Sequence, residues 1–140
     1  MRIITESEVR SVLTPKVVLE SIQGVFVEYA KGQAQMPSKV YLDMNTTGKH
    51  LCLIEGNFIT QARTAATTAL ATKSILMGDE TNRIAFIGCG AQTMPHLQFL
   101  LEVIDVKEIS LYDKDMSKAY NFANALGNVF EKIFVASSVG

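Results

Sequence analysis

The segment Arg83-Ile-Ala-Phe-Ile-Gly-Cys-Gly-Ala-Gln92 is the strongest indication of the fold in this chain. Its uncharged run from Ile84 to Ile87 is typical of a buried strand in a parallel sheet. Two glycines, Gly88 and Gly90, follow at the spacing that lets a backbone approach a phosphate group. A second strand-like run, Glu108 to Tyr112, ends at the acid Asp113, 25 residues after Gly88. The stretch therefore predicts a strand, a tight turn and the start of a helix.

The order strand, glycine turn, helix, strand and terminal acid is that of a dinucleotide-binding βαβ unit. In such a unit the pyrophosphate lies at the helix N-terminus and the acid binds the ribose hydroxyls. We therefore predict that Gly88 and Gly90 contact the cofactor and that Asp113 binds its ribose. Asp113 also favours NAD over NADP, because a carboxylate repels a 2′-phosphate.

The turn and the acid also have plainer interpretations. Glycine pairs occur in ligand-free α/β turns, and Asp113 is alternatively a solvated acid before Lys114. The third small residue of the usual glycine pattern is absent, since Thr93 stands where Gly or Ala would allow close packing of the helix on the strand. Cys89 is interpreted as a small residue whose N–H faces the phosphate, because no base that would activate its thiol is visible.

Three further elements are predicted to complete half of a doubly wound sheet. The helix after the turn extends over about residues 92–103, with Pro95 in its first turn, where the missing N–H costs no hydrogen bond. A second helix follows Asp113 and ends at Gly127. Lys132 to Ala136 then forms a third buried strand. This part of the chain is thus predicted to be α/β.

The N-terminal part is predicted to contain helices and short strands. Thr14 and Pro15 form a helix start, and Gly32 ends that helix. Alternating and apolar runs predict two strands that would form a hairpin, and an alanine-rich segment capped by Thr60 predicts a slim helix suited to close packing. The two strands and the helix extend over Met36–Asp43, His50–Glu55 and Gln61–Met77.

Composition excludes several classes of protein. The chain has 140 residues, 48% of them hydrophobic, and a formal charge of -1, so it can bury a core and offers no basic patch for nucleic acid. His50, His96, Cys52 and Cys89 have no metal-ligand spacing, so we predict no metal site. The charged N-terminus and the lack of a long apolar run predict no export signal and no membrane span. A reducing cytoplasm is the expected compartment.

Two motifs together resemble the ornithine cyclodeaminase/mu-crystallin family. One is the segment Gly56-Asn-Phe-Ile-Thr-Gln-Ala-Arg63-Thr-Ala-Ala66, and the other is the turn itself, which continues through Ala91 and Gln92. The Leu13-Thr-Pro start and the segment Met36-Pro-Ser-Lys39-Val-Tyr-Leu are also similar to this family. The resemblance implies an NAD cofactor, a small amino-acid or keto-acid substrate and a homodimer, with Ala91 and Gln92 in the cofactor site.

The resemblance also implies roles for two basic residues. Arg63 would contact the cofactor or a bound carboxylate, and we place it in the first turn of the helix after Thr60, where it would attract an anion. Lys39 would bind the substrate carboxylate or assist proton transfer as the catalytic residue. The residues alone leave plainer alternatives open, with Arg63 as a surface helix residue and Lys39 as a solvated lysine at the edge of a strand.

Several parts of the family's pattern are absent from this sequence. Family members carry several dozen further residues between the positions of Asp43 and Gly48, and the second half of their nucleotide domain would lie beyond Gly140. The predicted division is a partial N-terminal substrate and dimerisation domain over residues 1–62, a connecting helix over 63–82 and a partial Rossmann-type NAD-binding domain over 83–140. The overall expectation is a shortened α/β member of the family.

Two functions follow from the resemblance. The first is NAD-dependent amino-acid metabolism, in which hydride leaves the α-carbon of the substrate for the nicotinamide, an imine forms and ammonia is released, as in alanine dehydrogenases and ornithine cyclodeaminases. The segment around Lys39 favours the dehydrogenase-like branch. The second is a non-catalytic NAD(P)H-binding protein similar to mu-crystallin, or an inactive fragment that only associates with partner chains.

Overall fold

The computed structural model describes residues 2–34, 52–78 and 81–139. The chain divides into two compact units, Met1–Arg63 and Thr64–Gly140. Lys39 and the strand predicted over Met36–Asp43 lie outside the described residues.

The first unit combines a two-stranded parallel sheet with two helices. Strand β1 (Arg2–Ile4) precedes helix α1 (Glu6–Val12), and helix α2 (Pro15–Ala30) follows. The Thr5 hydroxyl accepts the Glu8 N–H while the Glu8 carboxylate accepts the Thr5 N–H, so a reciprocal capping box begins α1. Thr14 caps α2 in front of Pro15, which confirms the predicted helix start.

Strand β2 (Cys52–Ile54) pairs in parallel with β1, in the register Ile3 to Leu53. The sequence predicted β2 as half of a hairpin, whose other strand lies outside the described residues, and it predicted no strand at β1. A three-residue strand has no readable alternation, and its partner is some fifty residues away, so no local pattern could reveal this pairing.

Helix α3 (Asn57–Leu76) begins four residues before the predicted Gln61. The Glu55 carboxylate accepts the Asn57 N–H at 2.8 Å, and the Thr60 N–H already donates to the Gly56 carbonyl at 2.9 Å. Thr60 is therefore inside the helix rather than its cap. Four alanines of α3 are almost fully buried, as expected for a slim helix: Ala62, Ala65, Ala66 and Ala69.

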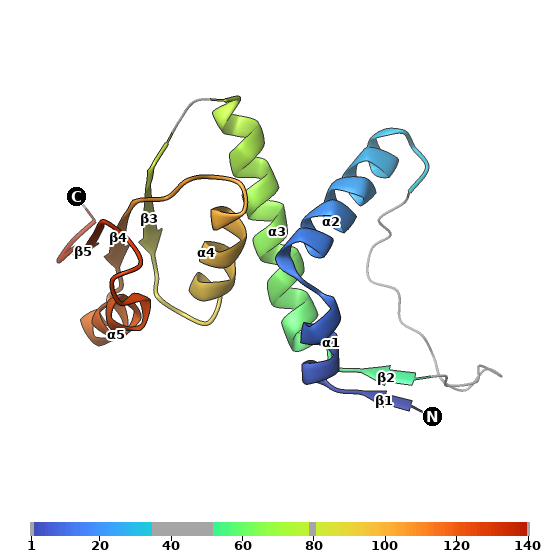
Figure 1. The fold of residues 1–140 in the computed structure, drawn as a ribbon, viewed down its shortest axis with the longest axis horizontal. Helices are drawn as coiled ribbons and strands as arrows, with labels where there is room; N and C mark the ends of the chain where they lie inside the picture. Colours follow the sequence, from blue (N-terminus) through green and yellow to red (C-terminus); the bar gives the residue numbers. More distant parts are fainter. Residues whose placement is uncertain (1, 35–51, 79–80, 140) are drawn as a thin grey trace. The chain divides into compact units, whose positions relative to one another are not determined.

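The second unit contains a three-stranded parallel sheet in the order β3-β4-β5 (Figure 1). Its strands are joined by two helices, and each strand pairs in parallel with the next, which is the βαβαβ pattern of half a doubly wound sheet. The predicted α/β fold is confirmed. The elements are β3 (Arg83–Ile87), α4 (Thr93–Leu101), β4 (Glu108–Tyr112), α5 (Met116–Leu126) and β5 (Lys132–Val135).

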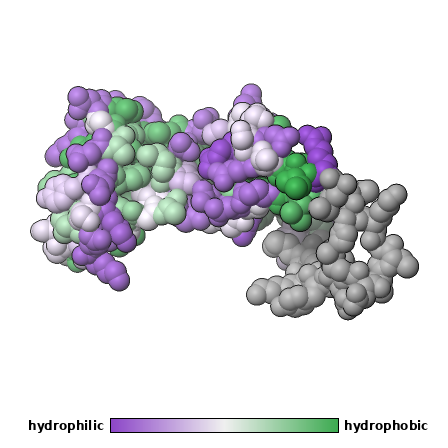
Figure 2. All heavy atoms as spheres, turned by 90° about the horizontal axis from the view of Figure 1, so that it is seen from below, coloured by the Kyte–Doolittle hydropathy of each residue, from purple (hydrophilic) through white to green (hydrophobic). Residues whose placement is uncertain are grey.

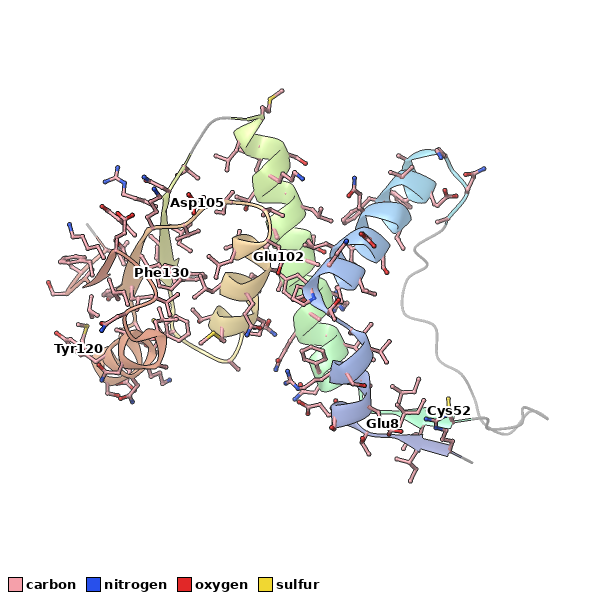
Figure 3. All side chains as sticks on the ribbon, in the orientation of Figure 1. Glu8, Cys52, Glu102, Asp105, Tyr120 and Phe130 are labelled. Carbon is pink, nitrogen blue, oxygen red and sulfur yellow. The ribbon has the colours of Figure 1, made fainter. Side chains whose placement is uncertain are left out.

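One face of this sheet is covered by α4 and α5. Ile109 and Leu111 of β4 lie at the centre of the core, with Leu97 from α4 and Ala119 from α5 against them. Phe130, labelled in Figure 3, lies between α5 and β5 and packs against the same core. Because consecutive parallel strands connect through right-handed crossovers, both helices lie on the same face.

The other face of the sheet carries apolar side chains that the described residues leave open. Ile87 on β3 is 72% exposed and Phe134 on β5 is 54% exposed. Figure 2 shows apolar (green) surface among hydrophilic (purple) residues on the part of the molecule formed by this unit. Burial in the second unit is therefore one-sided, and the carboxyl ends of its strands stay accessible.

Candidate functional site

The glycine turn connects β3 to α4 at the carboxyl end of the sheet. Gly88 has a φ of +101°, a conformation that side-chain-bearing residues rarely adopt. Its N–H donates to the Tyr112 carbonyl at 2.7 Å, and its carbonyl accepts the Thr93 hydroxyl at 3.1 Å. The turn is thus fastened to the end of β4 on one side and to the first residue of α4 on the other.

Asp113 lies inside this arrangement and is only 9% exposed. One carboxylate oxygen, Oδ2, accepts the Cys89 N–H at 2.8 Å, and the other, Oδ1, accepts the Asp115 N–H at 2.9 Å. These two backbone N–H groups, first Cys89 and then Asp115, lower the pKa of Asp113, and the Lys118 and Lys114 charges lower it further. Asp113 is therefore ionised and bonded to the backbone on both oxygens.

The Cys89 N–H does not face a phosphate position, which corrects the sequence interpretation. It donates to Asp113, and the thiol contacts the Tyr112 carbonyl, with 3.8 Å between Sγ and oxygen. Burial and the neighbouring Asp113 charge raise the pKa of the Cys89 thiol. Cys89 is therefore a neutral packing residue in the turn, without the thiolate that a nucleophile requires.

The next three backbone N–H groups, those of Gly90, Ala91 and Gln92, have no acceptor among the described residues. They come directly before α4, so they add to the partial positive charge at the start of that helix. A Cβ built on Gly90 would meet no atom within 4 Å. Together these groups form a backbone surface that can receive an anion such as a pyrophosphate.

A groove of about 470 Å³ adjoins the turn. Gly88 and Gln92 line its end near the turn, and His96 lines it from α4, with Nδ1 of His96 at 2.7 Å from the Gln92 carbonyl. A larger cavity, about 700 Å³, lies at the opposite, amino ends of β3 and β4, next to Asn82 and Lys107. Ligands of open parallel sheets bind at the carboxyl ends of the strands, so we assign the site to the smaller groove.

Both basic residues implied by the resemblance fall within the range of the first unit, Met1–Arg63. Arg63 is exposed on α3 and belongs to the first unit, whereas the glycine turn belongs to the second. Because α3 begins at Asn57, Arg63 is in the second turn of the helix, and the prediction that places it in the first turn is wrong. Lys39 lies outside the described residues.

Sequence reasoning missed the role of Thr93. This residue is buried, and its hydroxyl donates a hydrogen bond to the Gly88 carbonyl. Where the usual glycine pattern has a Gly or Ala that allows close packing, this chain has a residue that forms a hydrogen bond to the turn. The sequence shows a Thr at this position, but it does not show that the Gly88 carbonyl accepts the hydroxyl.

No group of three or more His, Cys, Asp or Glu side chains within residues 2–34, 52–78 and 81–139 is placed to hold a metal ion. In the same ranges no helix has the length and apolar character needed to cross a membrane.

Known proteins are similar to this chain in sequence and in fold. An alanine dehydrogenase of Archaeoglobus fulgidus is 26% identical over 165 positions, covering 87% of this chain and 51% of the enzyme. A Delta(1)-pyrroline-2-carboxylate reductase of Bacillus cereus is 32% identical, covering 72% of this chain and 31% of the enzyme. This chain thus spans about half the length of these curated relatives, or less. The 165 aligned positions exceed its 140 residues, so the alanine dehydrogenase has internal residues without a counterpart here.

A solved structure extends the likeness to three dimensions. The Delta(1)-pyrroline-2-carboxylate reductase of Thermococcus litoralis, in complex with NADH and L-proline, superposes with a TM-score of 0.84 and 22% identity, covering 99% of this chain and 58% of that one. The model of the ornithine cyclodeaminase/mu-crystallin family matches residues 42–139, which include both the Arg63 motif and the glycine turn. On these grounds the chain belongs to the ornithine cyclodeaminase/mu-crystallin family.

Proposed function

We propose that this chain binds NAD at the glycine turn, with the pyrophosphate on the N–H groups of Gly90, Ala91 and Gln92. The observation that carries this proposal is the run of three N–H groups at the start of α4 that have no acceptor among the described residues. Gly88 forms the turn and Gly90 leaves room for the phosphate to approach the backbone. Membership of the family and the NADH bound to the Thermococcus litoralis relative support the assignment.

The reaction proposed for the whole protein is oxidoreduction at the α-carbon of a small amino acid or its imine. NAD, when bound, supplies the hydride acceptor. The chain's own contribution at the described site is to hold the dinucleotide and fix its orientation by the turn. The names of the relatives favour substrates with an amino-acid carboxylate, and ammonia release remains part of the proposal for a dehydrogenase-like or cyclodeaminase-like reaction.

The roles of Arg63 and Lys39 also remain proposals. Arg63 would contact the cofactor or the substrate carboxylate, and Lys39 would bind that carboxylate or move a proton. The corresponding functional division is residues 1–62 for substrate and dimerisation, 63–82 as connecting helix and 83–140 for NAD. Cys52 and Cys89 are both free thiols, which suits the reducing cytoplasm expected from the sequence.

A homodimer formed by the first unit is part of this proposal. Ile3, Leu53 and Ile54 on its short parallel sheet are largely exposed, and a second copy would bury them. Sedimentation across a range of protein concentrations tests it. A species of dimer mass at micromolar concentration is expected, and a monomer at every concentration would refute the dimer.

A non-catalytic dinucleotide-binding protein is the second candidate. It is favoured by the location of the whole glycine turn in the second unit, which needs no residue of the first to present its three N–H groups. The enzyme and the non-catalytic protein are both expected to bind NADH, and they differ only in whether a substrate is converted. Binding of NADH without conversion of any substrate would support the binding protein and reject the enzyme for this chain.

The experiment is a calorimetric titration with NADH, followed by assays of nicotinamide absorbance with alanine, ornithine, lysine, Δ1-pyrroline-2-carboxylate, or pyruvate plus ammonia. The matched variants are Gly90→Ala and Gly24→Ala, because neither added Cβ meets protein within 4 Å. We expect Gly90→Ala to weaken NADH binding about tenfold and Gly24→Ala to leave it unchanged. Equal NADH affinity of all three proteins would reject the glycine turn as the cofactor site.

A further inference from the structure

The larger cavity, at the amino ends of β3 and β4, takes no part in the proposed function. Its volume of about 700 Å³ is in the range of small-molecule sites, about 300–1,000 Å³. Three segments line it: the end of α3, the residues before β3, and the connection from α4 to β4, in which Figure 3 labels Asp105. All three segments belong to the second unit, so the cavity is a property of that unit alone.

Met77 lines this cavity and is unusual in two ways. It directly follows α3 with a φ of +47°, a left-handed conformation that strains side-chain-bearing residues and that Gly or Asn usually adopts after a helix. The residue is also 90% exposed, so burial of its apolar surface does not offset the strain in the free chain. A ligand that covered Met77 would bury that surface.

Apolar side chains next to Met77 extend this surface. Leu76 is the last residue of α3, and Val103 and Ile104 come from the connection after α4; all three are half-buried. A flexible thioether among branched side chains adapts to apolar groups of different shape. The cavity therefore has an apolar wall, formed by two segments, for the apolar groups of a ligand.

Two opposite charges line different walls of the cavity. Lys73 comes from α3 and Asp105 from the connection between α4 and β4, and both are exposed. Among the described residues neither has an oppositely charged group within 4.0 Å, so the two do not pair with each other. Lys107, the other ammonium group here, is 3.9 Å from Glu131. Separate charges of opposite sign complement a zwitterion.

Asn82 also lines the cavity and carries a side-chain amide. Its backbone carbonyl accepts the Lys107 and Glu108 N–H groups, at 2.8 and 3.0 Å, so the residue is fixed against the start of β4. Its side-chain amide has no hydrogen bond within the part of the chain that the structure describes. An amide both donates and accepts, which is what a peptide bond requires of its partner.

We propose that this cavity binds an apolar dipeptide, with its ammonium group at Asp105, its carboxylate at Lys73, its peptide bond at Asn82 and its side chains against the apolar wall around Met77. A single amino acid would fill only a small part of about 700 Å³ and has no peptide bond. A ligand with one charge would leave Lys73 or Asp105 unpaired. None of these residues contributes to the glycine turn, so the inference does not depend on the proposed function.

Calorimetric titration of the chain with leucyl-leucine tests the class of ligand. Four comparison ligands each lack one contact: leucine, the N-acetyl derivative of the dipeptide, its amide, and glycyl-glycine. We expect each of them to bind at least about tenfold more weakly than leucyl-leucine. Equal affinity for one of them would overturn the contact that it lacks, and no binding of leucyl-leucine at millimolar concentration would overturn the proposal.

Two variants test the location of the ligand. Asp105→Asn and Lys73→Gln each remove one charge and keep the size of the side chain, and we expect each to weaken leucyl-leucine binding about tenfold. Lys16→Gln and Glu20→Gln, at exposed positions of α2, are the matched controls and should leave it unchanged. Unchanged affinity in Asp105→Asn and Lys73→Gln would overturn the cavity as the site.

NADH titration of the same proteins separates the inference from the proposed function. We expect the same NADH affinity in all four variants as in the wild-type chain. A chain that binds NADH but not leucyl-leucine overturns the inference alone, and a chain that binds leucyl-leucine but not NADH overturns the proposed function alone.

Met77→Gly distinguishes a ligand contact from an effect on the fold. Gly adopts a φ of +47° without strain, so the melting temperature of the free chain should rise. The affinity for leucyl-leucine should nevertheless fall about threefold or more, because the apolar contact is lost. A higher melting temperature with unchanged leucyl-leucine affinity would overturn the contact with Met77.

Discussion

The two ends of the sheet in the second unit differ in a way that volume does not reveal. The amino end borders the larger cavity, about 700 Å³, and the carboxyl end borders a groove of about 470 Å³. Among the described residues, only the carboxyl end combines a fixed glycine turn with N–H groups that have no acceptor before a helix. Oriented backbone donors are therefore a better indicator of a site for an anionic cofactor than the volume of a cavity.

The largest effect is expected from Gly88→Ala. The φ of +101° makes any side chain strained at this position, so we expect a loss of about 1–3 kcal/mol in the free energy of unfolding together with weaker NADH binding. Chemical denaturation and NADH titration measure the two effects. Gly90 has no such strain, so a Gly90→Ala variant destabilised as much as Gly88→Ala would contradict this account of the turn.

Acid should weaken the carboxyl end through Asp113. Its pKa is lowered in the folded chain, chiefly by the Cys89 N–H, so its contribution is present above the unfolded pKa of about 4 and is lost as pH falls through the folded value. Denaturation curves measured from neutral pH down to below about pH 4 should show stability falling more steeply for the wild-type chain than for Asp113→Asn. Parallel curves would show that the Cys89 and Asp115 bonds add no stability.

A smaller effect is expected from Thr93→Val, which keeps the shape of the side chain and removes the hydroxyl. The Gly88 carbonyl then loses its 3.1 Å donor, which costs about 1 kcal/mol of unfolding free energy. The melting temperature and the NADH affinity should both fall slightly. A more stable Thr93→Val variant would mean that the hydroxyl is poorly satisfied in its buried position.

The smallest effect is expected at the amino end. Lys107 lines the larger cavity and forms an exposed ion pair with Glu131 at 3.9 Å. Lys107→Ala should change stability by less than about 1 kcal/mol and leave NADH affinity unchanged. A loss of NADH binding in this variant would indicate that the cofactor binds at the amino end and would contradict the assignment of the site to the carboxyl end.

The elements of the second unit could be predicted because their signals are local. The uncharged run before Gly88, the proline tolerated in the first turn of α4 and the stop at Gly127 each depend on residues a few positions apart. The glycine turn lies where the sequence predicted it, but the partner of one of its backbone donors was predicted wrongly. Cys89 was expected to face the ligand and instead donates to Asp113.

The βαβ order, the family and the position of the glycine turn are all predictable from the amino-acid sequence, because periodicity, glycine spacing and short motifs are properties of neighbouring residues. Three contacts became known from the folded chain: β1 pairs with β2, the Thr93 hydroxyl donates to the Gly88 carbonyl, and the Asp113 carboxylate accepts the Cys89 N–H. The physical reason is that each of these is a hydrogen bond, and the partner of a hydrogen bond is set by the direction of donor and acceptor after folding, which residue types alone do not specify.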